Sequence, residues 1–251
     1  MESEQFASEA RRAAIIVGRP LEAALGADLV AVYLHGSGAL GGFRWDRSDL
    51  DILVLSRDAL SDAQFGGVTR ALAGLDYPAN GLELSVMTAN EALHPSFPAP
   101  RFELHQTTDG LDRTGIVVDG RTRGGDPDLI LHLAVCRARG VAIWGPPPSL
   151  SIASVPDEVV LTAMRGEVQW ARELASLEYL VLTAARFWLF VETRRISSKV
   201  EAGEWAAPRY DDPDLIEAAL ARQRGADAEI PRDAAERFAG HAASLANDFG
   251  R

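Results

Sequence analysis

Two aspartates that alternate within an apolar run are the residues of this sequence best suited to chemistry. Asp49 and Asp51 stand two residues apart in the run DLDILVL. In a β-strand such residues leave the same face, while Leu50 and Ile52 point to the other. Two carboxylates this close repel each other unless a cation lies between them, and oxygen ligands on a strand suit Mg²⁺ bound with nucleotide phosphates. The pair therefore predicts a magnesium site.

A glycine-serine pair precedes the aspartates. Gly36 and Ser37 follow the apolar run AVYLH, and a turn there can direct backbone N–H groups and the Ser37 hydroxyl at a phosphate. An isolated pair of alternating aspartates is also typical of an exposed strand whose acids keep a sheet edge soluble. The turn in front of the pair and the apolar residues on the other strand face favour the phosphate-and-metal interpretation.

A third carboxylate stands on a later predicted strand. Glu83 lies between Leu82 and Leu84 in the run GLELSVMT, where an acid is costly unless it faces a site or solvent. If this strand neighbours the run DLDILVL, Glu83 can act as the general base that takes a proton from an acceptor hydroxyl. The alternative is an exposed edge residue.

Strands and helices alternate through the first part of the chain and position these residues. Strands are predicted at 28–36, 49–55, 81–88, 101–106 and 114–118, helices at 3–25, 61–75 and 126–140, and a proline-rich loop at 90–100. Residues 144–158 have the composition of a linker. Every strong pattern beyond it is helical, at 156–175, 176–195, 197–206, 212–225 and 233–249. The prediction is an α+β chain with a mixed domain over residues 1–150 and an all-α bundle over residues 151–251.

The charge balance limits the class of partner. The chain has 25 basic and 36 acidic residues, a net charge of -11. A nucleic-acid binder normally needs a basic surface to replace counterions, so this balance argues against that partner. An acidic field concentrates cations and suits a cationic small molecule, although acidity also serves solubility alone.

Composition also indicates the compartment. The 251 residues are 47% hydrophobic, enough for a sizeable core, and the single Cys136 excludes an internal disulfide framework. The first residues carry acids before any apolar run, unlike a secretory signal. The apolar run at 177–191 is short and contains Glu178 and Arg186, which argues against a membrane span. We expect a soluble cytoplasmic protein, and we favour a monomer.

The motifs together resemble a known family. A Gly-Ser pair, the run DLD after eleven residues, and an acid on a later strand are similar to the nucleotidyltransferase superfamily that includes DNA polymerase β. The chain resembles more closely the streptomycin/spectinomycin adenylyltransferases, a branch of the aminoglycoside nucleotidyltransferases. This resemblance covers most of the chain and rests on three further segments in the same order: DPDLILHLAVCRARGVAIWGP, VLTAARFW and SSKVEAGEWA. It implies that the first domain is a polymerase-β-like nucleotidyltransferase domain.

The resemblance implies a role for each candidate residue of the first domain. Ser37 and Ser48 contact the nucleotide phosphates, beside Gly36. Asp49 and Asp51 hold Mg²⁺, and Glu83 adds a third carboxylate to this metal site. ATP is the co-substrate of the reaction. Glu83 is also the catalytic base.

The resemblance also places residues beyond this cluster. Arg186 and Lys199 match basic positions that reach ATP from the helical domain, so that ATP lies between two domains. Without the resemblance, Arg186 is interpreted as a snorkelling or interhelical residue. Asp128 matches an acid that lines the drug cleft. His132, one turn after Asp128, could share that cleft but is interpreted as a core histidine, and His35 as a residue packed beneath the Gly-Ser turn.

The helical part departs from its relatives. They carry an acidic, tryptophan-containing loop before the segment VLT, where the aminoglycoside is held. This chain is shorter there and offers Glu173 and Glu178 as acceptor-binding residues, with Ser176 where an acid is expected. An aromatic residue near the nucleotide is also absent around Gln223 and Arg224.

The predicted activity is an ATP- and Mg²⁺-dependent transfer of AMP. The acceptor is a hydroxyl of a cationic aminoglycoside or aminocyclitol antibiotic, streptomycin or spectinomycin or both, and the result is resistance. Alternatives are the same chemistry on another small-molecule or protein acceptor, and a non-catalytic nucleotide-binding module. Retention of all three acids favours an enzyme.

Overall fold

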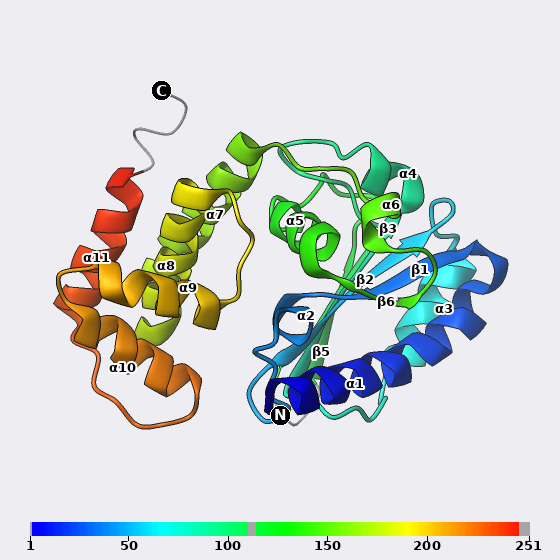
Figure 1. The fold of residues 1–251 in the computed structure, drawn as a ribbon. Coiled ribbons are helices and arrows are strands. Elements are labelled where there is room, and N and C mark those ends of the chain that lie inside the picture. Colours follow the sequence, from blue (N-terminus) through cyan, green and yellow to red (C-terminus); the bar gives the residue numbers. More distant parts are fainter. Residues whose placement is uncertain (1, 110–113, 246–251) are drawn as a thin grey trace. The chain divides into compact units, whose positions relative to one another are not determined.

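The structure, a computed structural model, describes residues 2–109 and 114–245 (Figure 1). Contacts divide the chain into two compact units, Met1–Val155 and Pro156–Arg251, and each is described by itself. In the described ranges, no helix combines the length and the apolar character needed to cross a membrane.

The first unit is built on a six-stranded mixed sheet with strand order β5-β4-β3-β2-β1-β6. Strands β2 and β3 run parallel, and the other neighbouring pairs are antiparallel. The strands are β1 (Leu29–Leu34), β2 (Asp49–Ser56), β3 (Gly81–Thr88), β4 (Leu104–Asp109), β5 (Thr114–Asp119) and β6 (Val141–Trp144).

The main core of this unit covers one face of the sheet. Apolar residues of α1 and α3, such as Val17 and Val68, pack there against Leu50 and Ile52 of β2, which are fully buried. The predicted alternation along β2 is confirmed, because Asp51 is only partly buried and Asp49 is exposed. The helical segments of the unit are α1 (Glu2–Leu25), η1 (Gly26–Asp28), α2 (Gly36–Leu40), α3 (Asp62–Leu72), α4 (Ala89–Leu93), α5 (Leu129–Arg139) and α6 (Pro148–Ser151).

The described part of the second unit is helical. Its central helix is α8, which packs against α7, α9, α10 and α11 (Figure 1). Phe187 and Trp188 of α8 are buried, as expected of a helix apolar on most sides. The elements are α7 (Asp157–Leu174), α8 (Leu177–Thr193), α9 (Lys199–Ala206), η2 (Ala207–Arg209), α10 (Pro213–Gln223) and α11 (Arg232–Leu245). The predicted α+β fold is confirmed.

Three short α-helices and the 3₁₀ segments η1 and η2 were not predicted. The expected turn at 36–37 is the start of α2, the loop predicted at 90–100 begins within α4, and the linker predicted at 144–158 contains α6. Helices of four or five residues are too short to produce a detectable period in the sequence. The last predicted helix, 233–249, is confirmed as far as Leu245, and its final residues lie outside the described ranges.

Candidate active site

The register of two parallel strands brings the predicted acids to one face of the sheet. Asp51 of β2 pairs with Glu83 of β3, and Asp49 pairs with Gly81. Residues paired in this way point to the same side, and so do residues two apart on one strand. The three carboxylates therefore share the face opposite the main core. The sequence left open whether the two strands are neighbours, and the structure shows that they are.

The carboxylate of Asp51 lies directly against Gly36. Gly36 has φ +52°, and a Cβ atom there would stand 1.8 Å from Oδ2 of Asp51. The backbone N–H of Ser37 donates to the same oxygen at 3.3 Å, and the N–H of His35 donates to the Asp51 carbonyl at 3.0 Å. Only glycine fits at position 36, because any side chain would displace the carboxylate. The glycine-serine pair and Asp51 thus form one tightly packed group.

The start of β2 is held in a comparable way. Asn80 Nδ2 donates to Oδ1 of Asp49 at 3.4 Å, and a Cβ on Gly81 would lie 2.5 Å from that oxygen. The Ser48 hydroxyl accepts the backbone N–H of Arg44 at 3.0 Å, while the Ser48 N–H donates to the Arg44 carbonyl at 2.7 Å. In this structure Ser48 therefore stabilises the loop that leads into the aspartates.

His132 of α5 contacts Glu83. Its Nε2 lies 3.3 Å from Oε1 of Glu83, and the two side chains are 18% and 33% exposed. The His132 ring also lies 5.0 Å from the ring of His35. Burial, with a smaller contribution from His132, lowers the pKa of His35 well below its usual range, so His35 is neutral. His35 is buried directly before the Gly-Ser segment, whereas the interpretation of His132 as a core residue is wrong, because its side chain is partly exposed and contacts Glu83.

His105 is a residue of this face that the sequence reasoning missed. It pairs with Ser85 on β3, and its Nδ1 lies 2.9 Å from the Ser85 hydroxyl oxygen. Burial lowers the pKa of His105, while the charges of Glu83, Asp126 and Asp128 oppose that shift and His132 reinforces it. Asp128, the N-cap of α5, therefore acts electrostatically on the same face. Alternation along β4 was the available signal, because Leu104 and Gln106 are buried on the other side.

The three carboxylates of this face are the candidate ligands for a divalent metal ion. Among residues 2–109 and 114–245, no three His, Cys, Asp or Glu side chains gather closely enough to hold a metal ion by themselves, so the structure does not support Glu83 as a third metal ligand beside Asp49 and Asp51. Asp49 and Asp51 nevertheless offer carboxylate oxygens from one strand face. Mg²⁺ is commonly bound by one or two carboxylates together with phosphate oxygens and water. This pair fits a metal that is bound jointly with a nucleotide.

The second unit holds the two predicted cations on neighbouring helices. Lys199 is the first residue of α9, directly after the N-cap Ser198, which forms a capping box with Glu201. Arg186 lies within α8, with Nη1 3.6 Å from Oε1 of Glu167. The helix predicted at 197–206 is confirmed as α9, with Lys199 at its start.

The predicted acceptor-binding acids of this unit have different surroundings. Glu173, near the end of α7, is exposed and accepts a hydrogen bond from Gln169 at 2.7 Å. Glu178, in the first turn of α8, lies 3.5 Å from Nε of Arg222. The structure thus pairs Glu178 with a cation of α10 and leaves Glu173 at the surface.

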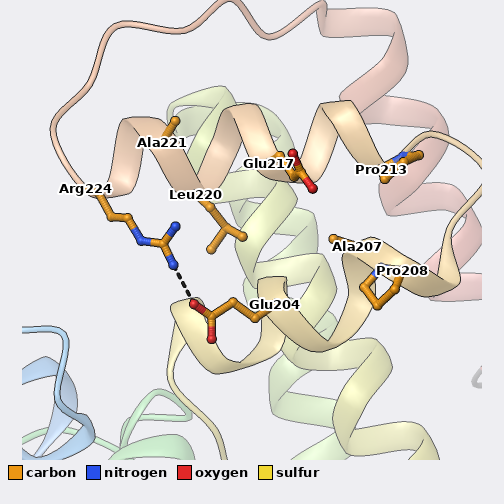
Figure 2. Close-up of a pocket in the computed structure, with 8 residues that line it drawn as sticks. All are labelled: Glu204, Ala207, Pro208, Pro213, Glu217, Leu220, Ala221 and Arg224. Carbon is orange, nitrogen blue, oxygen red and sulfur yellow. Dashed lines mark hydrogen bonds and ion pairs between the residues drawn. The ribbon is translucent and has the colours of Figure 1, made fainter.

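A pocket of about 420 Å³ lies between α9–η2 and α10 (Figure 2). Arg224 and Glu204 form an ion pair across its rim. None of the predicted site residues lines this pocket, so its shape does not bear on their assignment. Its walls are Glu204, Ala207, Pro208, Pro213, Glu217, Leu220, Ala221 and Arg224.

Comparisons with known proteins identify the family of this chain. The chain is 30% identical over 192 residues to a spectinomycin 9-adenylyltransferase of Staphylococcus aureus, an alignment covering 73% of this chain and 72% of the relative. The chain belongs to the aminoglycoside adenylyltransferases. A family model described as the aminoglycoside adenylyltransferase C-terminal domain matches residues 152–246, and a spectinomycin 9-adenylyltransferase of Campylobacter jejuni is 23% identical over 73% of both chains.

A solved structure supports the fold of this adenylyltransferase. The crystal structure of spectinomycin adenyltransferase AAD(9) from Enterococcus faecialis, with ATP and spectinomycin, matches with a TM-score of 0.67. It is 18% identical, and the match covers 93% of this chain and 97% of that one. The resemblance inferred from the motifs is confirmed, and the protein is a nucleotidyltransferase enzyme.

Proposed function

We propose that this enzyme transfers AMP from ATP to a hydroxyl group of spectinomycin, with streptomycin as a second candidate acceptor, and so confers resistance. The observation that carries the proposal is the parallel register that sets Glu83 beside Asp51, with Asp49 on the same face. The relatives named for spectinomycin support the choice of acceptor. The ATP and spectinomycin named with the AAD(9) structure support the pair of substrates.

Glu83 serves as the general base in this reaction. It takes the proton of the acceptor hydroxyl, the freed oxygen attacks the α-phosphorus of ATP, and the bond to the bridging oxygen breaks so that pyrophosphate leaves. His132, 3.3 Å from Oε1 of Glu83, orients the carboxylate. Asp128, whose charge acts on this face, attracts a cationic acceptor.

Asp49 and Asp51 hold Mg²⁺ in this proposal. When bound, the metal supplies positive charge that neutralises the phosphate oxygens. Gly36, Ser37 and Ser48 line the phosphate end of the nucleotide beside these acids. Their packing supports this role, because Gly36 leaves no room for a side chain between backbone and carboxylate.

The cations of the second unit bind the phosphates and stabilise the leaving pyrophosphate, and the acids bind the acceptor. Arg186 and Lys199 supply the positive charge that a triphosphate requires. Glu173 and Glu178 supply negative charge for a cationic antibiotic. The net charge of -11 supports such an acceptor, because an acidic protein concentrates cations near its surface.

The direct test incubates the protein with Mg²⁺, ATP and either spectinomycin or streptomycin, and detects the AMP adduct by mass. We expect an adduct with spectinomycin that Glu83→Gln and Asp49→Asn abolish. Asp46→Asn is the matched control, because Asp46 is an exposed acid of the loop before β2 and is paired with Arg44 at 3.3 Å. An Asp49→Asn enzyme with full activity contradicts the metal assignment, and an adduct on neither antibiotic contradicts the proposed acceptor.

A further inference from the structure

The cations of the second unit are held by two residues to which no role has been assigned. Glu167 of α7 and Tyr179 of α8 contact them. This inference rests on the proposed role of Arg186 and Lys199 in binding ATP, and it concerns what keeps those two side chains in place.

Arg186 and Glu167 form a largely buried pair. Nη1 of Arg186 lies 3.6 Å from Oε1 of Glu167, and the side chains are 13% and 18% exposed. Nε of Arg186 and Oε2 of Glu167 are buried and have no hydrogen-bond partner among the described residues. A buried pair that leaves polar atoms unsatisfied adds little to folding stability. What the contact supplies is a defined position for the guanidinium group.

Tyr179 links that pair to the second cation. Its hydroxyl donates to Oε1 of Glu167 at 2.9 Å, so one carboxylate oxygen faces both the phenol and the guanidinium. The Nζ atom of Lys199 lies 3.5 Å from the centroid of the Tyr179 ring, within the range of a cation–π interaction. Trp170 packs edge-on against the same ring at 5.7 Å and fixes its plane. The contacts thus run continuously from Arg186 through Glu167 and Tyr179 to Lys199.

The negative charge of Glu167 makes it possible to distinguish two roles: positioning of the cations, and an effect on ATP binding through net charge alone. A carboxylate beside a phosphate-binding arginine repels a triphosphate, so its charge alone weakens binding of ATP. If attraction were all that mattered, loss of Glu167 would strengthen ATP binding. If geometry matters, loss of the acceptor oxygen weakens it.

We propose that Glu167 and Tyr179 are positioning residues, which hold Arg186 and Lys199 in the orientation that binds the triphosphate of ATP. Glu167 fixes the guanidinium and the phenol through one oxygen. The ring of Tyr179 supports the ammonium group of Lys199. Neither residue contacts ATP itself.

The test measures the dissociation constant of ATP for the full chain by calorimetry, together with KM and kcat. Lys199→Ala and Arg186→Ala come first, and each should weaken ATP binding. If neither does, the proposed nucleotide role of these cations is wrong and the inference falls with it. This outcome is distinct from failure of the positioning role, which appears only in the substitutions of Tyr179 and Glu167.

Tyr179 is then tested in a double-mutant cycle with Lys199. Tyr179→Leu removes the ring and should weaken ATP binding about 3- to 30-fold, the range of a cation–π contact. In a Lys199→Ala background it should have less than half that effect on the logarithm of the constant, because the ammonium group is gone. Tyr179→Phe keeps the ring and should leave most of the Lys199 contribution intact. Equal effects of Tyr179→Leu in both backgrounds overturn the proposal.

Glu167 supplies the second arm of the experiment. Glu167→Gln keeps an oxygen acceptor and should bind ATP as well as the native chain or better, whereas Glu167→Leu should bind it more weakly. Tighter binding by Glu167→Leu overturns positioning in favour of charge alone. Tyr210→Leu is the matched control, because Tyr210 packs on Phe238 at 4.7 Å in the same unit and lies outside these contacts. Melting temperatures of all variants identify any that fail to fold, and Tyr179→Met or Glu167→Met then replaces a Leu variant that does, with the same expected and contradicting outcomes.

Discussion

The acidic face of the first unit and the cation cluster of the second are proposed to serve one reaction, but they are held in different ways. Asp49, Asp51 and Glu83 stand on two paired strands, whose register fixes their spacing through backbone hydrogen bonds. Arg186 and Lys199 stand on separate helices and are linked by side chains alone. Backbone register positions the acids, whereas neighbouring side chains position the cations.

This difference predicts opposite sensitivities. On the strand face, activity should depend on the length of each acid and on the backbone beside it, and less on neighbouring side chains. In the cation cluster, neighbouring side chains should matter most.

Shortening the Glu83 side chain by one methylene group should lower kcat more than the retained carboxylate would suggest. Glu83→Asp keeps the carboxylate, but the strand cannot move to compensate, and a misplacement of about 1 Å can reduce a rate about 100-fold. We expect a fall of that size in kcat with little change in KM for ATP, measured by pyrophosphate release. Glu83→Gln removes the base and sets the lower limit of activity, with a loss in kcat of about 10²- to 10⁴-fold. A Glu83→Asp enzyme with more than a third of native activity contradicts the rigidity of this face.

The backbone at Gly36 should be nearly as sensitive. In Gly36→Ala the new Cβ would stand 1.8 Å from Oδ2 of Asp51, so the carboxylate must move, and kcat/KM should fall about 10- to 100-fold. Gly26→Ala is the matched control, because Gly26 has φ +56° against +52° at Gly36 and nothing lies within 4 Å of its Cβ. Both variants should lose about 1–2 kcal/mol of stability from the left-handed backbone. Equal activity in the two would show that Asp51 has room to adjust.

The sequence predicted the strand face well for a physical reason. Alternation has a period of two, so the run DLDILVL assigns Asp49 and Asp51 to one side and Leu50 to the other without knowledge of partners. Pairing with the strand of Glu83 had to be assumed, because parallel pairing is decided by packing of the whole sheet. Confirmation came from the register of β2 and β3.

Contacts between elements far apart in the chain could not be predicted from the sequence. His132 meets Glu83, and Tyr179 meets Lys199, over separations of 49 and 20 residues in the chain. No local period marks such contacts, because each depends on how a helix packs against the sheet or against another helix. Glu167 was overlooked for the same reason: an acid on an amphipathic helix has the pattern of a solvated residue until its partner is known.

Loss of the histidine beside Glu83 should have a moderate effect. His132→Leu removes a polar contact to the carboxylate, worth about 1.5 kcal/mol for a hydrogen bond to a charged group, so kcat should fall about tenfold. His132→Gln restores a donor and should recover part of that loss. If Leu and Gln variants fall equally, volume rather than the contact explains the effect. A loss in kcat as large as that of Glu83→Gln would contradict the proposed difference between the two regions, because a side chain would then position an acid of the strand face.

The smallest effects are expected at the acids proposed to bind the acceptor. This small effect distinguishes them from the cation cluster of the same unit. Glu178 lies 3.5 Å from Nε of Arg222 and is partly buried, whereas Glu173 is exposed. Glu178→Gln should raise KM for spectinomycin about 2- to 5-fold, since partly exposed charge pairs contribute up to about 1 kcal/mol, and Glu173→Gln should change it less. KM for ATP should stay constant in both, in contrast to Tyr179→Leu. A changed KM for ATP in Glu178→Gln would assign this acid to nucleotide binding. The residues that position the cations would then include Glu178, at the start of α8.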